Sequence, residues 1–270
     1  MNNDWLIRTE ILIGKDSLQR LRETRITIIG LGGVGSYAAE NIARAGVNNI
    51  QLIDYDTVSQ SNINRQLIAL NSTIGIHKTQ AMKARILDIN PEANVNTFSE
   101  FLNNNNRLEI IKNSDYIIDA IDSIGPKMGV IKDLCYLNIP FISVLGAGNR
   151  LNPASIKITS IWQAEGCPFA KRIKKLLRKN NVTKDFQVIF SEEPPLPVGA
   201  ILCDCPNNTP IPKSIVGSIS YIPAIMGSIA AGKIIQDIIA PDTPPPLRRS
   251  NNTPPPLEGV GGGLNNYSKR

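Results

Sequence analysis

Two groups of residues near the start of the chain are of types that bind a nucleotide. Gly30, Gly32 and Gly35 stand in Gly-Leu-Gly-Gly-Val-Gly, directly after a short β-branched run. A glycine-rich turn between a strand and a helix lets the backbone approach a phosphate, toward which the helix directs its amides and its dipole. Asp54 ends the next apolar run, where a carboxylate accepts hydrogen bonds from ribose hydroxyls. These residues predict an adenosine nucleotide without separating ATP from NAD.

Charged residues further along favour a triphosphate. Arg65 lies in Ser61-Asn-Ile-Asn-Arg-Gln66, and Lys78 follows thirteen residues later. Each cation is expected to contribute about 1.5–3 kcal/mol through charge-assisted hydrogen bonds to phosphate, with Asn62 able to orient them. Asp122 is placed to hold Mg²⁺ between phosphate oxygens. Taken singly, Arg65 and Lys78 are also typical of a solvated surface, and Asp122 is also typical of a helix N-cap. Taken together, the motifs predict an ATP site that activates a carboxylate.

The elements that must position these residues alternate along the chain. Short apolar runs predict strands at 26–30, 50–54, 95–98, 116–119 and 141–145. Helices are expected between them at 34–45, 78–89, 107–112 and 127–137. This alternation predicts an α/β fold with a doubly wound, mainly parallel, Rossmann-like sheet. Two further strands, at 156–160 and 187–190, extend the sheet, and whether they run antiparallel stays open.

The last third of the chain divides into three segments. Residues 191–212 are rich in proline and asparagine and predict a crossover loop, and a helix follows at 215–239 with a kink expected at Pro223. The helix has no charge over 17 residues, near the lower limit for a membrane span, but its small residues favour a buried core or interface helix over a membrane anchor. Residues 241–270 repeat Thr-Pro-Pro-Pro-Leu and predict a disordered tail beyond a domain of residues 1–240.

The charge pattern indicates an anionic partner. The chain has a formal net charge of +6, and seven basic residues with no acidic one lie between Lys171 and Lys184. The 22 other basic residues nearly balance the 23 acidic ones. Lys171, Lys174, Lys175 and Arg178 share one face of a helix, which is typical either of an amphipathic surface helix or of a surface for nucleic-acid phosphates. The excess of positive charge favours the second interpretation.

The cysteines indicate a reducing environment. The four of them are too few and too irregularly spaced for a disulfide framework, and the first residues are polar without an apolar leader, so a cytoplasmic protein is expected. Structural zinc is not expected, because there are no two Cys-x-x-Cys pairs to supply four thiolates. Cys203 and Cys205 lie in the predicted crossover loop, and whether either is a nucleophile or a bystander stays open.

The series of motifs resembles the adenylating enzymes related to ubiquitin activation, whose bacterial members activate sulfur-carrier proteins for molybdopterin and thiamine synthesis. It resembles one branch in particular, the tRNA threonylcarbamoyladenosine dehydratases. The resemblance covers about residues 5–240 and is carried by the segments Arg8–Gly14, Asn64–Leu70, Ile89–Pro91, Pro126–Lys127 and Phe190–Glu193. It identifies residues 1–240 as an adenylation domain.

The resemblance also implies site residues and partners. The residues expected at ATP are Gly30, Gly32, Gly33, Gly35, Asp54, Asp56, Ser61, Asn62, Asn64, Arg65, Lys78 and Asp122. Arg8 matches an arginine that reaches the ATP of the partner in a homodimer, so the catalytic set is Arg8, Arg65, Lys78 and Asp122, with Asp122 as the Mg²⁺ ligand. Some family members are linked to cysteine desulfurase systems, so a sulfur-acceptor partner is a further expectation.

The implied reaction is the ATP-dependent dehydration of threonylcarbamoyladenosine beside the tRNA anticodon. The threonyl carboxylate attacks the α-phosphate of ATP, and the carbamoyl group then closes a ring on the acyl-adenylate and releases AMP. The alternative is adenylation of the C-terminal glycine of a ubiquitin-like sulfur carrier, which the missing zinc cysteines and the basic helix make less favourable. A nucleotide-binding module without turnover and an NAD-dependent oxidoreductase rank below both.

Overall fold

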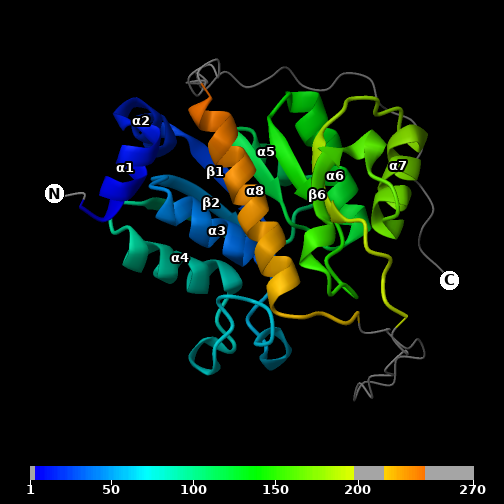
Figure 1. The fold of residues 1–270 in the computed structure, drawn as a ribbon, viewed down its shortest axis with the longest axis horizontal. Helices are drawn as coiled ribbons and strands as arrows, with labels where there is room; N and C mark the ends of the chain where they lie inside the picture. The colour runs from blue at the N-terminus through cyan, green and yellow to red at the C-terminus, as the bar shows by residue number, and fades with distance from the viewer. Residues whose placement is uncertain (1–3, 198–215, 241–270) are drawn as a thin grey trace.

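The computed structural model describes residues 4–197 and 216–240 (Figure 1). Seven strands form one sheet in the order β3-β2-β1-β4-β5-β7-β6, in which only β6 and β7 pair antiparallel. The strands are β1 (Arg25–Ile29), β2 (Asn49–Ile53), β3 (Asn94–Phe98), β4 (Tyr116–Asp119), β5 (Phe141–Val144), β6 (Ile156–Ser160) and β7 (Gln187–Ser191). The predicted doubly wound, mainly parallel sheet is confirmed.

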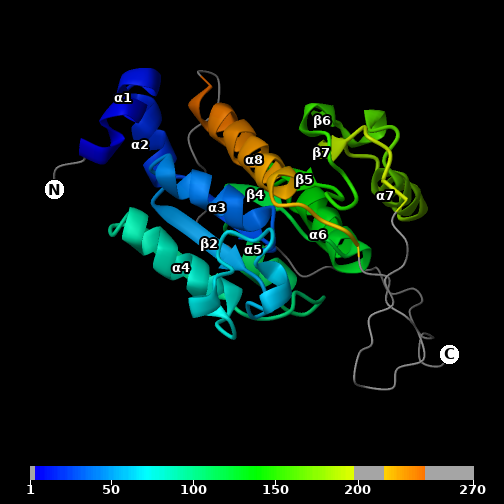
Figure 2. The same ribbon diagram turned by 60° about the horizontal axis from the view of Figure 1, so that its bottom comes forward.

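Helices cover both faces of this sheet (Figures 1 and 2). One face carries α2 (Lys15–Glu23), α3 (Gly35–Arg44), α4 (Lys78–Ile89) and α8 (Tyr221–Ile239). The other face carries α5 (Arg107–Ile111) and α6 (Ile124–Leu137), and α7 (Pro168–Lys179) packs beside α6. Helix α1 (Ile7–Ile13) precedes α2 and contacts it. The central strands are therefore buried on both sides, which is why they are continuous runs of isoleucine and leucine.

The order of the strands creates the place where a ligand can bind. The chain winds from β1 through β2 to β3 in one direction and then returns to β4, which pairs with the other side of β1. The connections that leave β1 and β4 consequently diverge to opposite faces of the sheet. Open α/β sheets bind ligands in the crevice that this divergence leaves at the carboxyl ends of the strands.

The helix predicted at 215–239 begins at Tyr221, six residues later than expected. Pro223 is its third residue and lies in the first turn, where its missing N–H leaves no helical hydrogen bond unmade, so the predicted kink is wrong. Within the described ranges, α8 is the one helix whose length and composition are sufficient for a membrane span. Met226 and Ile234 nevertheless pack in the core cluster that includes α3, which confirms the prediction of a core helix.

The helix predicted at 127–137 begins earlier, at Ile124, and Ser123 takes the N-cap position. Ser191 ends β7 instead of opening the crossover loop. Most of that loop, including Cys203 and Cys205, and the whole predicted tail lie outside the described residues.

Candidate functional site

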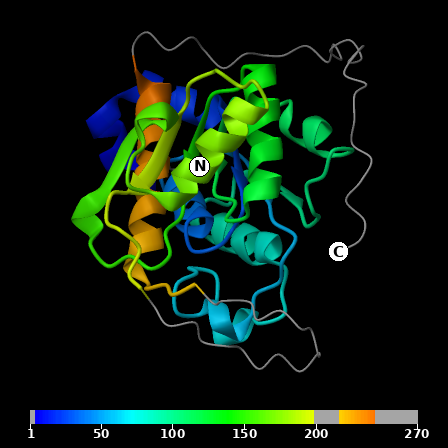
Figure 3. The same cartoon turned by 90° about the vertical axis from the view of Figure 1, so that its right-hand side faces the viewer.

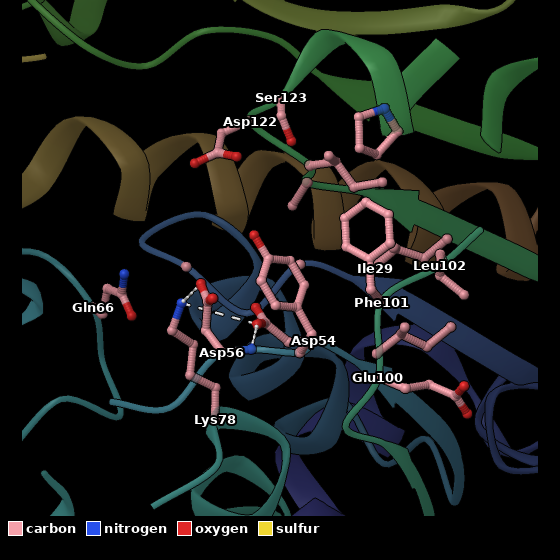
Figure 4. Close-up of a pocket in the computed structure, with 17 residues that line it drawn as sticks. Ile29, Asp54, Asp56, Gln66, Lys78, Glu100, Phe101, Leu102, Asp122 and Ser123 are labelled. Carbon is pink, nitrogen blue, oxygen red and sulfur yellow. Dashed lines mark hydrogen bonds and ion pairs between the residues drawn. The ribbon is translucent and has the colours of Figure 1, made fainter. Parts of the chain in front are cut away.

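A cavity lies at the carboxyl ends of β1, β2 and β4, where the winding of the sheet changes direction (Figure 4). The empty space in it, counted together with the open solvent at its mouth, is about 660 Å³. Its walls bring together several residues predicted from the sequence, namely Gly30, Gly32, Asp54, Asp56, Lys78 and Asp122. Residues that were not predicted also line it, among them Tyr55, Gln66 and Phe101.

The glycine turn is tight enough to require its glycines. Gly30 has φ +87°, and a Cβ on Gly35 would lie 1.7 Å from the carbonyl oxygen of Gly30. The turn is therefore folded directly onto the start of α3. Near Gly32, by contrast, a Cβ would approach only the Gln66 amide nitrogen, at 3.8 Å, so this stretch of backbone faces the cavity. Gly33 packs against Pro223 at the start of α8.

Lys78 and two aspartates form a charged group on the floor of the cavity (Figure 4). The Lys78 Nζ lies 2.7 Å from Asp56 Oδ2 and 3.9 Å from Asp54 Oδ1, and Lys78 is 5% exposed. Burial raises the pKa of Asp54, while Lys78 and two backbone amides oppose the shift. One of these amides is that of Leu31, 2.6 Å from Asp54 Oδ2, so the carboxylate ties the glycine turn to β2.

Asp122 has a different environment. Its carboxylate is exposed, points into the cavity, and makes no hydrogen bond or ion pair with any residue that the structure describes (Figure 4). The alternative that Asp122 is an N-cap is wrong, because Ser123 occupies that position. A free carboxylate at the rim of this cavity is suited to a hydrated divalent cation.

A buried ion pair that sequence reasoning missed supports the segment before Asp122. Lys127 and Asp119 are both fully buried, with Nζ 2.9 Å from Asp119 Oδ2. The same Nζ donates to the carbonyl oxygens of Asp119 and Ile121, at 3.2 and 3.0 Å. Burial lowers the pKa of Lys127, and Asp119 opposes the shift. The ammonium group thus fixes the backbone that leads from β4 to Asp122.

Arg65 and its neighbours form the loop beside the glycine turn. The Arg65 Nη1 donates to the Ser61 carbonyl and to Asn64 Oδ1, both at 2.9 Å, and no carboxylate of the described residues pairs with it. Asn62 accepts the Ser59 amide with its side chain and the Arg65 amide with its carbonyl. Ser61, Asn62 and Asn64, which were predicted to contact ATP, do not line the cavity and instead shape this loop.

A second cavity adjoins the first. The two share five lining residues, which are Gly32, Gln66, Ala120, Ile121 and Asp122. The second has an empty volume of about 1030 Å³ and extends past Arg65 and Gly33 to Gly146–Gly148 after β5, Phe169 in α7, and the start of α8. A ligand in the second cavity can therefore meet a nucleotide in the first at the boundary formed by Asp122 and Gln66.

Arg8 is not part of either cavity within one chain. It is exposed on α1, whose preceding residue Leu6 packs at Gly46, between the end of α3 and the start of β2. This is the amino end of the strands, whereas the cavities lie at their carboxyl ends (Figure 1). Helix α1 buries none of its residues, and Ile11 and Leu12 are among the most exposed large apolar side chains of the described residues.

The basic helix α7 lies at the edge of the molecule that faces the viewer in Figure 3. Lys171 and Lys175 are exposed, as predicted. Lys174 is half-buried and donates to the Ala164 carbonyl at 2.8 Å, so it anchors the helix and is less free than predicted. The Arg178 guanidinium lies 5.5 Å from the centroid of the Trp162 ring. The sequence prediction omitted two further exposed cations, which are Arg172 and Lys179.

Comparisons with known proteins agree with this geometry. Residues 7–255 match the model of the ThiF family. The tRNA threonylcarbamoyladenosine dehydratase of Bacillus subtilis is 38% identical over 237 residues, which are 86% of this chain and 93% of the relative. The enzyme of the same name from Haemophilus influenzae is 37% identical over 66% of this chain and 72% of its own length. The molybdopterin-synthase adenylyltransferase of that organism is 30% identical over 61% of this chain and 66% of its own length.

A solved structure extends the likeness to three dimensions. The crystal structure of Escherichia coli tRNA N6-threonylcarbamoyladenosine dehydratase in complex with ATP superposes with a TM-score of 0.78 at 30% identity, covering 88% of this chain and 96% of that one. A structure of the same enzyme with AMP superposes equally well. The chain therefore belongs to the ThiF family, in which the relatives it matches at 35–38% identity are tRNA threonylcarbamoyladenosine dehydratases.

Proposed function

We propose that this chain catalyses the ATP-dependent dehydration of threonylcarbamoyladenosine in tRNA. The observation that carries the proposal is the pair of adjoining cavities that share Asp122 in their lining, one suited to a nucleotide and the other to the molecule that the nucleotide activates. The names and the ATP and AMP ligands of the relatives support it. The first cavity then holds ATP, with its ribose at Asp54 and its phosphates beside the glycine turn and Lys78.

Mg²⁺ fits the free carboxylate of Asp122. The cation usually takes one or two protein carboxylates and completes its shell with phosphate oxygens and water. When bound, it neutralises charge on the phosphates. Asp54 and Asp56 are less suited to this role, because both are engaged by Lys78 and Asp54 also by the Leu31 amide.

The chemistry has two steps. A carboxylate oxygen of the threonyl group attacks the α-phosphorus, and the bond to the pyrophosphate oxygen breaks. Lys78 and Arg65 stabilise the negative charge that builds up on the phosphates. An atom of the carbamoyl group then attacks the activated carbonyl carbon, the bond to AMP breaks, and the carbamoyl group loses one proton. The second step is intramolecular, so its rate depends on how the acceptor is oriented.

The direct test uses purified protein, ATP, Mg²⁺ and tRNA that carries threonylcarbamoyladenosine. Mass spectrometry of the digested tRNA should show a nucleoside lighter by one water, formed together with AMP and pyrophosphate. If the tRNA is unchanged while a ubiquitin-like sulfur carrier supports pyrophosphate exchange, the proposed function is wrong and the carrier-activating alternative replaces it.

The exposed cations of α7 are proposed to bind the phosphates of the tRNA. Replacing Lys171 and Lys175 together with alanine should weaken tRNA binding and reduce the slope of log K against log salt by about 1.5. The free energy of unfolding should change by less than about 0.5 kcal/mol, because both side chains are solvated. Fluorescence titrations at several salt concentrations measure the slope. Lys83→Ala on α4 is the matched control, and an equal loss in that variant would contradict the assignment.

Arg8 is proposed to act in the active site of a second copy of the chain. The cavities lie at the carboxyl ends of the strands, and Arg8 lies at the opposite end of the sheet. The exposed apolar residues of α1 form a surface that a homodimer interface can bury. In a two-fold dimer each α1 then lies against the partner. This assignment also accounts for an exposed arginine that makes no hydrogen bond or ion pair with the described residues of its own chain.

A mixing experiment tests this assignment. Arg8→Ala and Lys78→Met homodimers should each be nearly inactive, but heterodimers purified on two affinity tags after co-expression should have about half of the wild-type activity per site, since one of the two sites in each heterodimer is intact. Turnover of ATP in the presence of substrate tRNA measures it. A mixture that stays inactive, although heterodimers are recovered on both tags, would place Arg8 in its own chain's site or outside catalysis.

We place the protein in the cytoplasm, where its relatives' substrate tRNA is found. The packing of α8 against α3 supports a core role for this helix instead of membrane contact. A sulfur-acceptor partner stays a prediction.

A further inference from the structure

Gln66 occupies an unusual position at the boundary between the two cavities. It lines both of them and comes from the loop that also carries Arg65. It is 7% exposed, and its Oε1 is buried without a hydrogen-bond partner among the described residues. Buried polar atoms nearly always have a partner, so an orphaned acceptor that faces a cavity indicates a ligand that supplies the missing donor.

Hydrogen bonds hold the backbone around Gln66 in place, so the unpartnered side-chain Oε1 is not the result of a loose loop. The Gln66 amide N–H donates to the Asn62 carbonyl at 2.9 Å, and the Gln66 carbonyl accepts from the Ala69 amide at 3.0 Å. The next residue, Leu67, donates to Ser36 Oγ in the first turn of α3. The side-chain Nε2 lies 3.8 Å from the position of a Cβ on Gly32, next to the glycine turn.

The triphosphate does not supply the donor that Gln66 Oε1 lacks. Phosphate oxygens only accept hydrogen bonds, and the ribose has Asp54 at the end of β2. The acceptor substrate proposed above, in contrast, contains a urea in which a carbonyl stands between two N–H groups. A carboxamide and a urea are complementary, because Oε1 accepts from an N–H while Nε2 donates to the urea carbonyl.

We propose that Gln66 binds the urea of the modified adenosine and holds it against the activated carbonyl for ring closure. This inference rests on the proposed function. Gln66 then acts mainly in the second step: it orients the attacking group after the acyl-adenylate has formed, and it adds little to the binding of ATP. Without this hydrogen bonding the carbonyl stays activated but the urea is free to turn away, so water competes for the acyl-adenylate.

The experiment measures AMP released per cyclic nucleoside formed, with intact dimeric protein, ATP, Mg²⁺ and substrate tRNA. Gln66→Met keeps the length of the side chain and removes both hydrogen-bonding groups. For this variant we expect the ratio to rise from about one to at least about three, with the affinity for ATP within about twofold of the wild type. Gln60→Met, an exposed glutamine in the same loop region, is the matched control and should keep the wild-type ratio.

The possible outcomes separate the two proposals. If wild-type protein forms no cyclic nucleoside, the proposed function fails and the inference fails with it. If the wild type forms it and Gln66→Met keeps a ratio near one, only the inference is wrong, since a purely structural role lowers AMP release and ring closure together. A tenfold loss of ATP affinity in Gln66→Met, with its melting temperature unchanged, would assign Gln66 to the nucleotide and also overturn the inference.

Discussion

Replacing Lys78 with methionine is expected to lower kcat/KM for ATP by about 10²–10³-fold. The buried ammonium group donates to Asp56 and lies 3.9 Å from Asp54, and its other protons are available for a phosphate oxygen in the cavity. Methionine fills a similar volume and supplies no charge. Pyrophosphate release in the presence of substrate tRNA measures the effect. Lys83→Met, further along α4 and without an ion pair to any residue that the structure describes, should keep wild-type activity.

The same substitution also affects stability, and a second variant separates the two effects. Without Lys78 the partly buried pair Asp54 and Asp56 loses its counter-charge, so the pKa of Asp54, already raised by burial, should rise further. Lys78→Met combined with Asp56→Asn removes one of the two negative charges. The double variant should regain stability in denaturant titrations without regaining activity. Recovery of activity together with stability would show that Lys78 acts only as a structural counter-ion.

The fold was predictable because its determinants are local. Strands buried on both faces are continuous apolar runs, and the glycine turn marks the first crossover, so the order of elements can be derived from the chain alone. Helix starts were less predictable, because they depend on caps. The apolar run from Val216 has no helical structure until Tyr221, and this shift moves Pro223 from a helix interior to a first turn.

The site was most predictable where a residue type has one use. Glycines are required at positions 30 and 35 because the backbone approaches closely there, and the spacing of the glycines in the sequence indicates this turn. Polar residues of the loop from Ser61 to Gln66 are ambiguous, because the sequence does not tell a side chain that shapes a loop from one that faces a ligand. Asn62, which the sequence predicts at the ligand, accepts the Ser59 amide and lines neither cavity, whereas Gln66, which it does not predict, lines both. Its place in the same motif was the available signal.

The buried pair of Lys127 and Asp119 leads to the second large expected effect. Replacing Lys127 with methionine should lower the free energy of unfolding by about 3–5 kcal/mol, because it leaves the Asp119 carboxylate buried without its counter-charge. The carbonyl of Ile121 loses its donor as well, so the segment before Asp122 is released. Urea titrations of the free energy of unfolding, followed by circular dichroism, measure the change.

Combining Lys127→Met with Asp119→Asn tests whether the uncompensated charge is the cause. An asparagine at position 119 still accepts the Ile121 amide and pairs with the Ser143 hydroxyl, which donates to Asp119 at 2.7 Å in the native protein. The double variant should therefore recover at least about 2 kcal/mol of the loss, since burying a neutral amide costs far less than burying an unpaired carboxylate. A double variant as unstable as Lys127→Met alone would mean that the lysine stabilises the fold through its packing and its two backbone carbonyl partners, and that its charge is incidental.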